Sequence, residues 1–366
     1  MKIAVTGFSN CGKTTVFNAL TGQNIPTTIY TGAVEDPVMG VVKVPDERVD
    51  RLSEIFDPLK ITYATIEFID YMGIATGEND RNRKVFELFK DADALVEVVR
   101  AFSDDSVLHP EGSVDAVRDA DNFEIELMLL DLELIEKRLQ RMEESIKRGK
   151  KIEQSEKEIL LKCKEALDNN TALRNITFTH EELKAISHLQ FVSIMPKIII
   201  VNISEEDIKG DKSASFAESI SKKLGFDKNK IIVLCGKVEM EIAQLEKNEA
   251  KEFLIELGIN EPAMSVVIKK SYELLGLTSF LTVGKEEVRA WTIPINCPAP
   301  QAAGKIHSDI EQGFIKAETI SYDDFIATGS MQEARKAGRL RLEGKNYLVQ
   351  SGDIIDFRFN VTKQSK

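Results

Sequence analysis

A phosphate-binding loop near the start of the chain constrains the fold more than any other feature. The sequence MKIAVTGFSNCGKTT places a short apolar run, residues 3–5, directly before the pattern G-x-x-x-x-G-K-T, which extends from Gly7 to Thr14. Glycines let the backbone turn so that successive N–H groups face one anion, and the N-terminus of a following helix adds positive potential. With a helix expected from Lys13 to Leu20, this order of strand, loop and helix predicts that the chain binds the phosphates of a nucleotide.

The types of residue in this loop indicate their roles. Lys13 would reach the β- and γ-phosphates as a point charge, and the Thr14 hydroxyl would be a ligand of Mg²⁺, which we expect as the cofactor. The loop does not identify the nucleotide. The candidate nucleotide-binding residues that it supplies are Ser9, Asn10, Cys11, Gly12, Lys13, Thr14 and Thr15.

Length and composition indicate a soluble globular protein of two or three domains. The chain has 366 residues, of which 43% are apolar and 30% charged. Its formal net charge of −12 argues against a wholly basic surface but leaves room for a local basic patch. We expect no secretory leader and no membrane span, because the first strand begins at once and no apolar run is long enough. Four scattered cysteines suit free thiols in the cytoplasm, and a monomer is expected.

Further apolar runs predict a parallel sheet that is covered on both faces. Its strands are expected at Ile66–Ile69, Ala94–Val99, Ile198–Val201 and Ile231–Leu234. Ligands of open α/β sheets bind at the carboxyl ends of the strands. The residues at those ends are Asp70, Arg100, Asn202 and Cys235.

Two regions depart from this alternating pattern. From Asp121 to about Asn169 the sequence is charged and helical, with apolar residues at spacings of three and four, which predicts an antiparallel helical hairpin. The apolar stripe is interpreted as the seam between the two helices, and an exposed part that docks a partner is the alternative. Its members in the first helix are Ile125, Leu129, Leu132, Ile135, Leu139, Met142 and Ile146.

The last 85 or so residues predict a small α+β domain with a mixed sheet. Strands are expected at Val288–Ile293 and Ile354–Phe359, and helices near Ala302–Glu311 and Met331–Ala337. The predicted fold class is therefore α/β: a P-loop parallel sheet with an inserted helical hairpin and a C-terminal α+β domain. The expected boundaries are 1–118 and 191–278 for the nucleotide-binding domain, 119–190 for the hairpin and 279–366 for the last domain.

Three strand ends carry residues that are expected to complete the site of a phosphate loop. FIDYMG supplies Asp70 and Gly73, expected to hold the Mg²⁺ shell and to sense the γ-phosphate as a switch. A second strand ends in Asn202-Ile203-Ser204-Glu205, where guanine-reading proteins have Asn-Lys-x-Asp. An Asp there accepts two hydrogen bonds from guanine, so the longer Glu205 favours ATP and leaves GTP open. The next strand ends in Cys235-Gly236, where a backbone turn that contacts the base is expected.

These motifs resemble the YchF group of Obg-like P-loop ATPases. The stretch DNFEIELMLLDLELIEKRL resembles the start of that family's coiled-coil arm. EEVRAWTIP, APQAAGKIHSDIEQGFIKAE and GKNYLVQSGDIIDFRFN resemble its C-terminal TGS domain, a ubiquitin-like module. The resemblance implies ATP binding in preference to GTP, slow hydrolysis and association with ribosomes.

The resemblance extends to single residues. The phosphate loop, the second switch at Asp70 and Gly73, and the base-reading Asn202 and Glu205 match the family's motifs. Ile74 stands where Ras-like proteins have the catalytic glutamine, and the family likewise has an apolar residue there. A slow enzyme is implied, since no side chain would orient the attacking water.

Both switch regions depart from the family pattern. GENDRNRK, from Gly77 to Lys84, lacks the family's glycines. In TTIYTGAVEDPVMG, Asp36 and Pro37 align with the family's Glu-Pro, but Val34 occupies the place of its threonine. The residues that could substitute are Thr27, Thr28 and Thr31. These departures favour a divergent member that binds nucleotide yet hydrolyses it poorly.

Three alternatives to an ATP-hydrolysing switch therefore stay open. The first is a nucleotide-stabilised binding module without useful turnover, and the second is a GTP-specific switch. The third is a direct RNA binder that uses a basic run near the C-terminus. Its candidate residues are Arg335, Lys336, Arg339, Arg341 and Lys345, with Tyr347 and Phe357 nearby.

Overall fold

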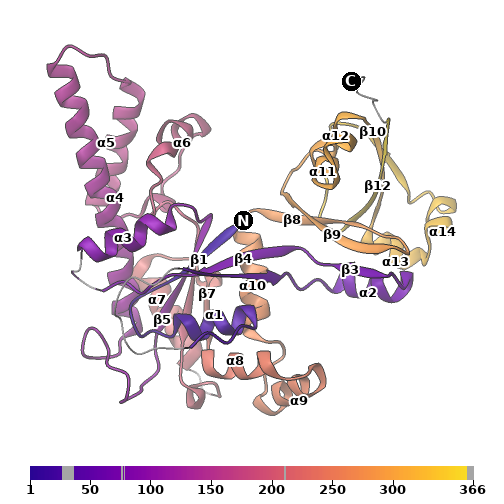
Figure 1. Cartoon of the computed structure of the whole chain (residues 1–366), viewed down its shortest axis with the longest axis horizontal. Helices are drawn as coiled ribbons and strands as arrows, with labels where there is room; N and C mark the ends of the chain where they lie inside the picture. The colour runs from indigo at the N-terminus through magenta and orange to yellow at the C-terminus, as the bar shows by residue number, and fades with distance from the viewer. Residues whose placement is uncertain (27–36, 76, 78, 210–211, 361–366) are drawn as a thin grey trace. The chain divides into compact units, whose positions relative to one another are not determined.

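The computed structural model describes residues 1–26, 37–75, 77, 79–209 and 212–360 (Figure 1). The chain divides into two compact units: Met1–Gly40 with Glu67–Val267, and Val41–Ile66 with Ile268–Lys366. The first-switch residues of the sequence prediction, Thr27, Thr28, Thr31, Val34 and Asp36, lie outside the described residues, so that prediction stays untested.

A largely parallel sheet organises the first unit, as predicted. Its strands lie in the order β2-β4-β1-β5-β6-β7. Every residue of β5 and β6 is buried, which explains why apolar residues dominate these two strands in the sequence. The strands are β1 (Lys2–Thr6), β2 (Val38–Lys43), β4 (Thr65–Asp70), β5 (Ala94–Arg100), β6 (Lys197–Asn202) and β7 (Ile231–Leu234).

Helices cover this sheet and complete two hydrophobic cores. One core joins β1, β4 and β5 to α3 and α4, through side chains such as Phe86 and Phe123. The other joins β5, β6 and β7 to α7, α8 and α9, through side chains such as Ile220 and Val238. The predicted helix after the phosphate loop is confirmed as α1. The helices are α1 (Lys13–Thr21), α3 (Asn79–Phe89), α4 (Ala116–Lys147), α5 (Gln154–Asp168), α6 (His180–Ile186), α7 (Lys212–Leu224), α8 (Gly236–Gln244), α9 (Lys247–Leu257) and α10 (Ala263–Leu274), whose last residues belong to the second unit.

The predicted helical hairpin is confirmed as α4 and α5, which we call the arm (Figure 1). Its seam differs in part from the predicted stripe. Ile135 and Met142 are buried against α5, where Ile159, Cys163 and Leu167 meet them. Ile125, Leu129 and Ile146 are instead exposed, because the side of a helix that faces a partner is narrower than the whole apolar stripe.

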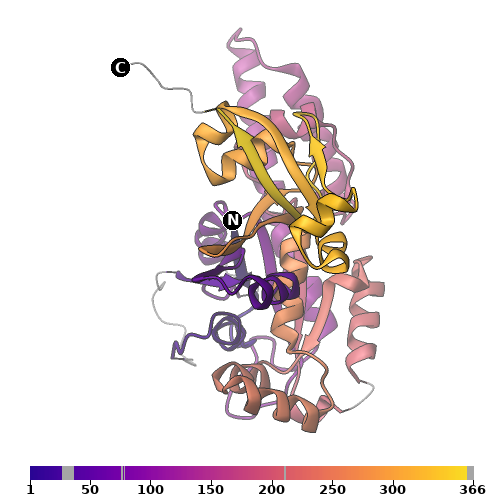
Figure 2. The ribbon, with the colours of Figure 1, turned by 90° about the vertical axis from the view of Figure 1, so that its right-hand side faces the viewer.

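The second unit is built on a mixed sheet, as predicted, in the order β11-β10-β12-β8-β9-β3. β12 pairs with β8 in parallel, and β8 pairs with β9 antiparallel. Helices α11 and α12 lie on one face of this sheet (Figure 2), where Ala302 and Ala303 pack against Phe280 and Phe357. The elements are α2 (Glu47–Phe56), β3 (Lys60–Thr62), β8 (Leu277–Thr282), β9 (Glu287–Pro294), α11 (Ala299–Ile306), α12 (Ser308–Gln312), β10 (Phe314–Ser321), α13 (Tyr322–Thr328), α14 (Met331–Lys336), β11 (Arg341–Glu343) and β12 (Asp353–Phe359).

A segment from the N-terminal third of the sequence completes this second unit. β3 pairs in parallel with β9, and Phe56 at the end of α2 stacks on Phe325 at 5.6 Å between ring centroids. The sequence did not indicate this, because β3 has three residues and no apolar run to mark it. Residues 41–66, which were expected in the nucleotide-binding domain, group with the C-terminal unit. The domain boundary predicted at residue 118 stays a prediction.

Candidate functional site

The phosphate loop forms a tight turn between β1 and α1. Asn10 and Gly12 both have positive φ, 63° and 90°. A Cβ atom at Gly12 would lie 2.3 Å from Nδ2 of Asn202, so glycine is required there by space as well as by conformation. Lys13 is buried, and its ammonium donates a hydrogen bond to the carbonyl oxygen of Phe8 at 2.8 Å. The amine is thus held against the backbone of the loop that would bind a phosphate.

Two oxygen donors meet beside the loop. The Thr14 hydroxyl donates to Oδ2 of Asp70, at the carboxyl end of β4, at 2.8 Å. Mg²⁺ prefers oxygen ligands and is commonly bound by one or two protein side chains together with phosphates. The Thr14 and Asp70 pair therefore fits the donor set that a Mg²⁺–nucleotide site needs.

The segment after β4 lies directly on the phosphate loop. The Ser9 N–H donates to the carbonyl of Ile74 at 3.0 Å, and the Ile74 N–H donates to the carbonyl of Gly7 at 3.1 Å. A Cβ atom at Gly73 would lie 2.6 Å from the Lys13 amine and 2.8 Å from the Ser9 nitrogen. The absence of a side chain at Gly73 consequently allows residues 71–75, which we call the switch segment, to lie this close to the phosphate loop.

Ile74 itself faces the protein interior. Its side chain is fully buried in the core that contains Phe8, Phe123 and Leu127. The residue at the position of the Ras-like glutamine therefore has no side-chain atom that could orient a water molecule. The structure thereby locates the catalytic candidates, Lys13 at the loop and Ile74 behind it.

Asn202 joins three parts of the site. Its Nδ2 donates to the Cys11 carbonyl at 3.1 Å, and its Oδ1 accepts from the Gly236 N–H at 2.9 Å. The end of β6, the phosphate loop and the turn after β7 are thus linked by one buried amide. Cys11 is buried as well, and burial raises the pKa of its thiol, so this cysteine is a small packed side chain rather than a reactive one.

Glu205 is the most exposed of the predicted base-reading residues. Its side chain is 57% exposed, and Oε2 lies 3.8 Å from the ammonium of Lys237 at the start of α8. Ile203, two residues before Glu205, is buried, and its N–H donates to the Leu234 carbonyl at 2.9 Å. The remaining predicted residues are brought together at one sheet edge, and Glu205 lies at the open rim of that group.

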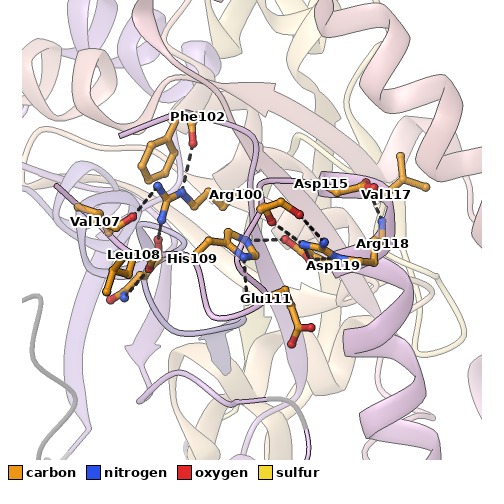
Figure 3. A network of polar contacts seen from close by, with 12 residues as sticks. Arg100, Phe102, Val107, Leu108, His109, Glu111, Asp115, Val117, Arg118 and Asp119 are labelled. Carbon is orange, nitrogen blue, oxygen red and sulfur yellow. Dashed lines mark hydrogen bonds and ion pairs between the residues drawn. The ribbon is translucent and has the colours of Figure 1, made fainter. Parts of the chain in front are cut away.

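An arginine that sequence reasoning left without a role fixes the loop after β5 (Figure 3). Nε of Arg100 donates to the Phe102 carbonyl at 3.1 Å and one terminal nitrogen donates to the Val107 carbonyl at 3.0 Å. Its guanidinium carbon lies 4.5 Å from the centre of the Phe102 ring. Asn10 of the phosphate loop donates to the Leu108 carbonyl at 3.1 Å. The loop of residues 101–115 is thus held against the phosphate loop.

The same loop is fastened to the base of the arm (Figure 3). Nδ1 of His109 accepts the Glu111 N–H at 3.1 Å, so Nε2 carries the proton and donates to Asp119 on α4 at 2.8 Å. Arg118 also donates to Asp119, at 3.0 and 2.8 Å. The histidine pattern of the sequence gave no signal for this contact, because His109 and Asp119 are ordinary residues at an unremarkable spacing.

The switch segment is tied to the arm further along. The buried Asn82, on α3, donates to the Ala75 carbonyl at 2.7 Å and to Glu126 of α4 at 3.0 Å. Arg83 donates to both carboxylate oxygens of Glu133 at 2.7 Å. A continuous set of contacts therefore leads from Gly73 at the phosphate loop to the first helix of the arm.

The basic run near the C-terminus is largely paired with acidic side chains, and its use as an RNA-binding surface stays a prediction. Arg335 pairs with Glu318 at 2.7 Å, and Arg341 pairs with Asp353 at 3.2 Å. Phe357 is buried in the core of the second unit and cannot stack on a base. Lys336 and Arg339 also have acidic partners, Glu333 and Asp324. This run belongs mainly to the unit's own network of ion pairs.

The fold and this sheet edge define a P-loop nucleotide-binding protein with a helical arm and an additional C-terminal unit. In the part of the chain that the structure describes, no helix is long and apolar enough to cross a membrane. A family model described as a 50S ribosome-binding GTPase matches residues 2–161. The model of the YchF GTPase C-terminal domain, described as a protein of unknown function, matches residues 277–360.

The chain belongs to the YchF family. It is 41% identical over 360 residues to the ribosome-binding ATPase YchF of Bacillus subtilis (strain 168), and this match covers 98% of both chains. Identity to the ribosome-binding ATPase YchF of Escherichia coli O157:H7 is 38% over 363 residues, which cover 98% of this chain and 99% of the relative. The solved structure of the Schizosaccharomyces pombe YchF GTPase matches with a TM-score of 0.82 at 29% identity, over 98% of this chain and 97% of that one.

Proposed function

We propose that this chain is a nucleotide-dependent switch that binds ATP with Mg²⁺, hydrolyses its β–γ bond slowly and associates with ribosomes. The observation that carries the proposal is the direct packing of the switch segment on the phosphate loop, with Gly73 against Lys13 and Ser9. A γ-phosphate that contacts both segments would change how they pack. Curated relatives named ribosome-binding ATPases support the nucleotide and the partner.

The signal has a physical route in the first unit. Asn82 and Arg83, on the helix α3 that follows the switch glycine, bind Glu126 and Glu133 of the arm helix α4. Movement of the switch segment would therefore pull on, or release, the base of the arm. A contact that changes between two arrangements is what a nucleotide switch needs to report its state to a large partner.

The residues of the site would have separate roles in binding the nucleotide. Lys13 would bind the β- and γ-phosphates, and Thr14 with Asp70 would hold Mg²⁺, which neutralises charge on the phosphate oxygens when it is bound. Asn202 would keep the base-side wall in register with the loop. Because Ile74 is apolar and buried, this position supplies no side chain that activates water, which supports slow turnover.

The base preference would depend on Glu205. Its exposed carboxylate can accept a hydrogen bond from an amino group of a purine, and the nearby Lys237 lies on the same rim. We propose ATP over GTP, since the longer side chain replaces the aspartate that pairs with guanine. A GTP-specific switch is the alternative within the same function.

The first test is an equilibrium titration with fluorescent ATP and GTP analogues and Mg²⁺, competed by unlabelled nucleotides. We expect ATP to compete better, Lys13→Met to abolish triphosphate binding, and Lys222→Met, at an exposed lysine of α7, to leave it unchanged. Glu205→Ala should bring the affinities for ATP and GTP closer together. A preference for GTP would overturn the base assignment, and failure to bind either nucleotide would overturn the switch.

A second candidate is a nucleotide-stabilised binding module without useful turnover. The buried Ile74 is the observation that favours it. Multiple-turnover hydrolysis, measured with and without purified ribosomes, separates the two functions. Ribosome-stimulated turnover supports the enzyme, and turnover absent in both conditions supports the binding module.

A further inference from the structure

The far end of the arm carries a compact basic cluster. Residues 145–152, which we call the arm tip, have the sequence SIKRGKKI and contain four basic residues and no acidic one. Helix α4 has 32 residues, which makes it about 48 Å long and places the arm tip far from the phosphate loop (Figure 1). The basic residues are Lys147, Arg148, Lys150 and Lys151.

The arm tip has a defined conformation. Gly149 has a φ of 73°, and the Lys150 N–H donates to the Ser145 carbonyl at 2.9 Å, which closes the C-terminus of α4. Below it the arm is held by its apolar seam and by the ion pair of Arg138 with Glu156 at 2.7 Å. The basic side chains are therefore presented on a rigid support and contribute little to the stability of the arm.

These side chains are exposed and largely uncompensated. Arg148 is 72% exposed and lies 3.7 Å from Glu144, the one acidic partner that the tip has among the described residues. Lys147, Lys150 and Lys151 form no ion pair within the described part of the chain. The basic run of the second unit, in contrast, is mostly paired with acids. The arm tip is thus a local positive patch on a chain of net charge −12.

The chemistry of the patch fits the phosphate backbone of RNA. It has no aromatic side chain that could stack on a base, so it would recognise charge and shape rather than sequence. The overall negative charge repels RNA, which means that any attraction must come from local patches of this kind. A projecting support lets such a patch enter a folded RNA without bringing the acidic body of the protein close.

We infer that the arm tip is an RNA-binding surface that contacts the phosphate backbone of ribosomal RNA. The inference rests on the proposed function, because association with ribosomes makes structured RNA the available partner. The inference names a partner for the arm, ribosomal RNA. The resemblance to the YchF family indicates only that the arm is a coiled coil.

The test uses the full-length protein and the variant K147Q/R148Q/K150Q/K151Q. Binding to intact ribosomes and to deproteinised ribosomal RNA is measured over a series of salt concentrations. We expect the affinity for both to fall about tenfold or more, and the slope of log K against log salt to fall by about 3, since four charges are removed. Nucleotide affinity and thermal stability should match those of the wild type.

The control is K222Q/K223Q/K228Q/K230Q, which removes the same charge from another exposed cluster of the first unit. It should keep most of the affinity. If the tip variant and the control bind ribosomes and RNA equally well, the inference about the arm tip is wrong, but the proposed association with ribosomes is unaffected. If the tip variant loses ribosomes but binds naked RNA like the wild type, an acidic protein surface is the partner and the RNA assignment is wrong. If the wild type binds no ribosomes, the proposed function fails with it.

Discussion

Asn202 and Cys11, which are 191 positions apart in the sequence, are joined by one buried hydrogen bond of 3.1 Å from the side-chain amide to the backbone carbonyl. The same amide accepts the Gly236 N–H at 2.9 Å. A residue that a sequence motif marks for base recognition is therefore also the structural link between the phosphate loop and the base-side wall. Substitutions of Asn202 should therefore affect stability as well as nucleotide binding.

Asn202→Ala should destabilise the protein and weaken nucleotide binding together. The substitution leaves the Cys11 carbonyl and the Gly236 N–H buried without partners, at about 1–3 kcal/mol each. Urea unfolding measures the loss. Asn202→Asp serves as the control of equal size, since it keeps the acceptor for Gly236 but faces the Cys11 carbonyl with a second acceptor. An unchanged free energy of unfolding in both variants would show that the link has no energetic role.

Gly73→Ala should reduce affinity for the triphosphate more than for the diphosphate. The new Cβ would lie 2.6 Å from the Lys13 amine, so the switch segment must move away from the loop or the lysine must leave the Phe8 carbonyl. Isothermal titration with ATP and ADP measures the two affinities. Gly344→Ala is the matched control, because no atom lies within 4 Å of its added Cβ. Equal losses for both nucleotides would mean that Gly73 does not sense the γ-phosphate.

Ile74→Gln should destabilise the protein without accelerating hydrolysis. The position is fully buried among Phe8, Phe123 and Leu127, so an amide there would lose its water without gaining partners, at a cost of about 1–3 kcal/mol. Ile74→Val keeps the apolar contact and should cost only about 1 kcal/mol. Turnover is measured at a temperature where both variants stay folded. Faster hydrolysis by the glutamine variant would show that the side chain reaches the nucleotide.

Asn82→Ala should uncouple the switch segment from the arm. Asn82 is buried, and its amide binds both polar backbone atoms of Ala75 and the carboxylate of Glu126. Amide hydrogen exchange of α4, compared with and without bound nucleotide, reports the coupling. We expect nucleotide-dependent protection of the first turns of α4 in the wild type and its loss in the variant. Leu161→Ala, at an exposed site on the arm, should retain it.

The sequence was sufficient to predict those parts of the fold that follow a general pattern of residue types. The apolar runs of β5 and β6 mark buried parallel strands, and the phosphate-loop glycines mark the turn before α1, because backbone geometry demands those residue types. β3 could not be recognised, because Lys60 and Ile61 are exposed and its pairing with β9 depends on residues 227 positions away.

The candidate site divides in the same way. Lys13, Thr14 and Asp70 could be found because phosphate chemistry fixes their types and their order along the chain. Arg100, His109 and Asn82 could not, since each bonds to backbone carbonyls or to a carboxylate whose position only the tertiary structure determines. The ion pairs of the basic run at Arg335 to Lys345 could not be predicted for a related reason, because the sequence does not show which acids lie near it in the fold.

Glu97 gives the first unit a pH dependence with a defined sign. Its side chain on β5 is 1% exposed and pairs with the buried Lys197 at 2.6 Å, which also pairs with Glu124. Burial raises the pKa of Glu97 to about 7, against the opposing effect of the Lys197 ammonium. Burial also disfavours the ionised Glu124, but the charges of Lys197 and Arg174 hold its pKa at about 2.

We therefore expect Glu97 to make the free energy of unfolding fall as the pH rises from about 4.5 to about 7. In this window the folded protein keeps a proton that the unfolded chain has released, so raising the pH favours unfolding by at most about 1.4 kcal/mol per unit. Glu124 acts in the opposite direction but below pH 4.5, outside the window.

Urea unfolding at several pH values measures the slope, and Glu97→Gln should remove this contribution. Asp131, whose pKa burial raises to about 6, titrates in both proteins and cancels from the difference. Parallel curves for the wild type and Glu97→Gln would show that Glu97 stays ionised throughout and that its ion pair with Lys197 outweighs burial.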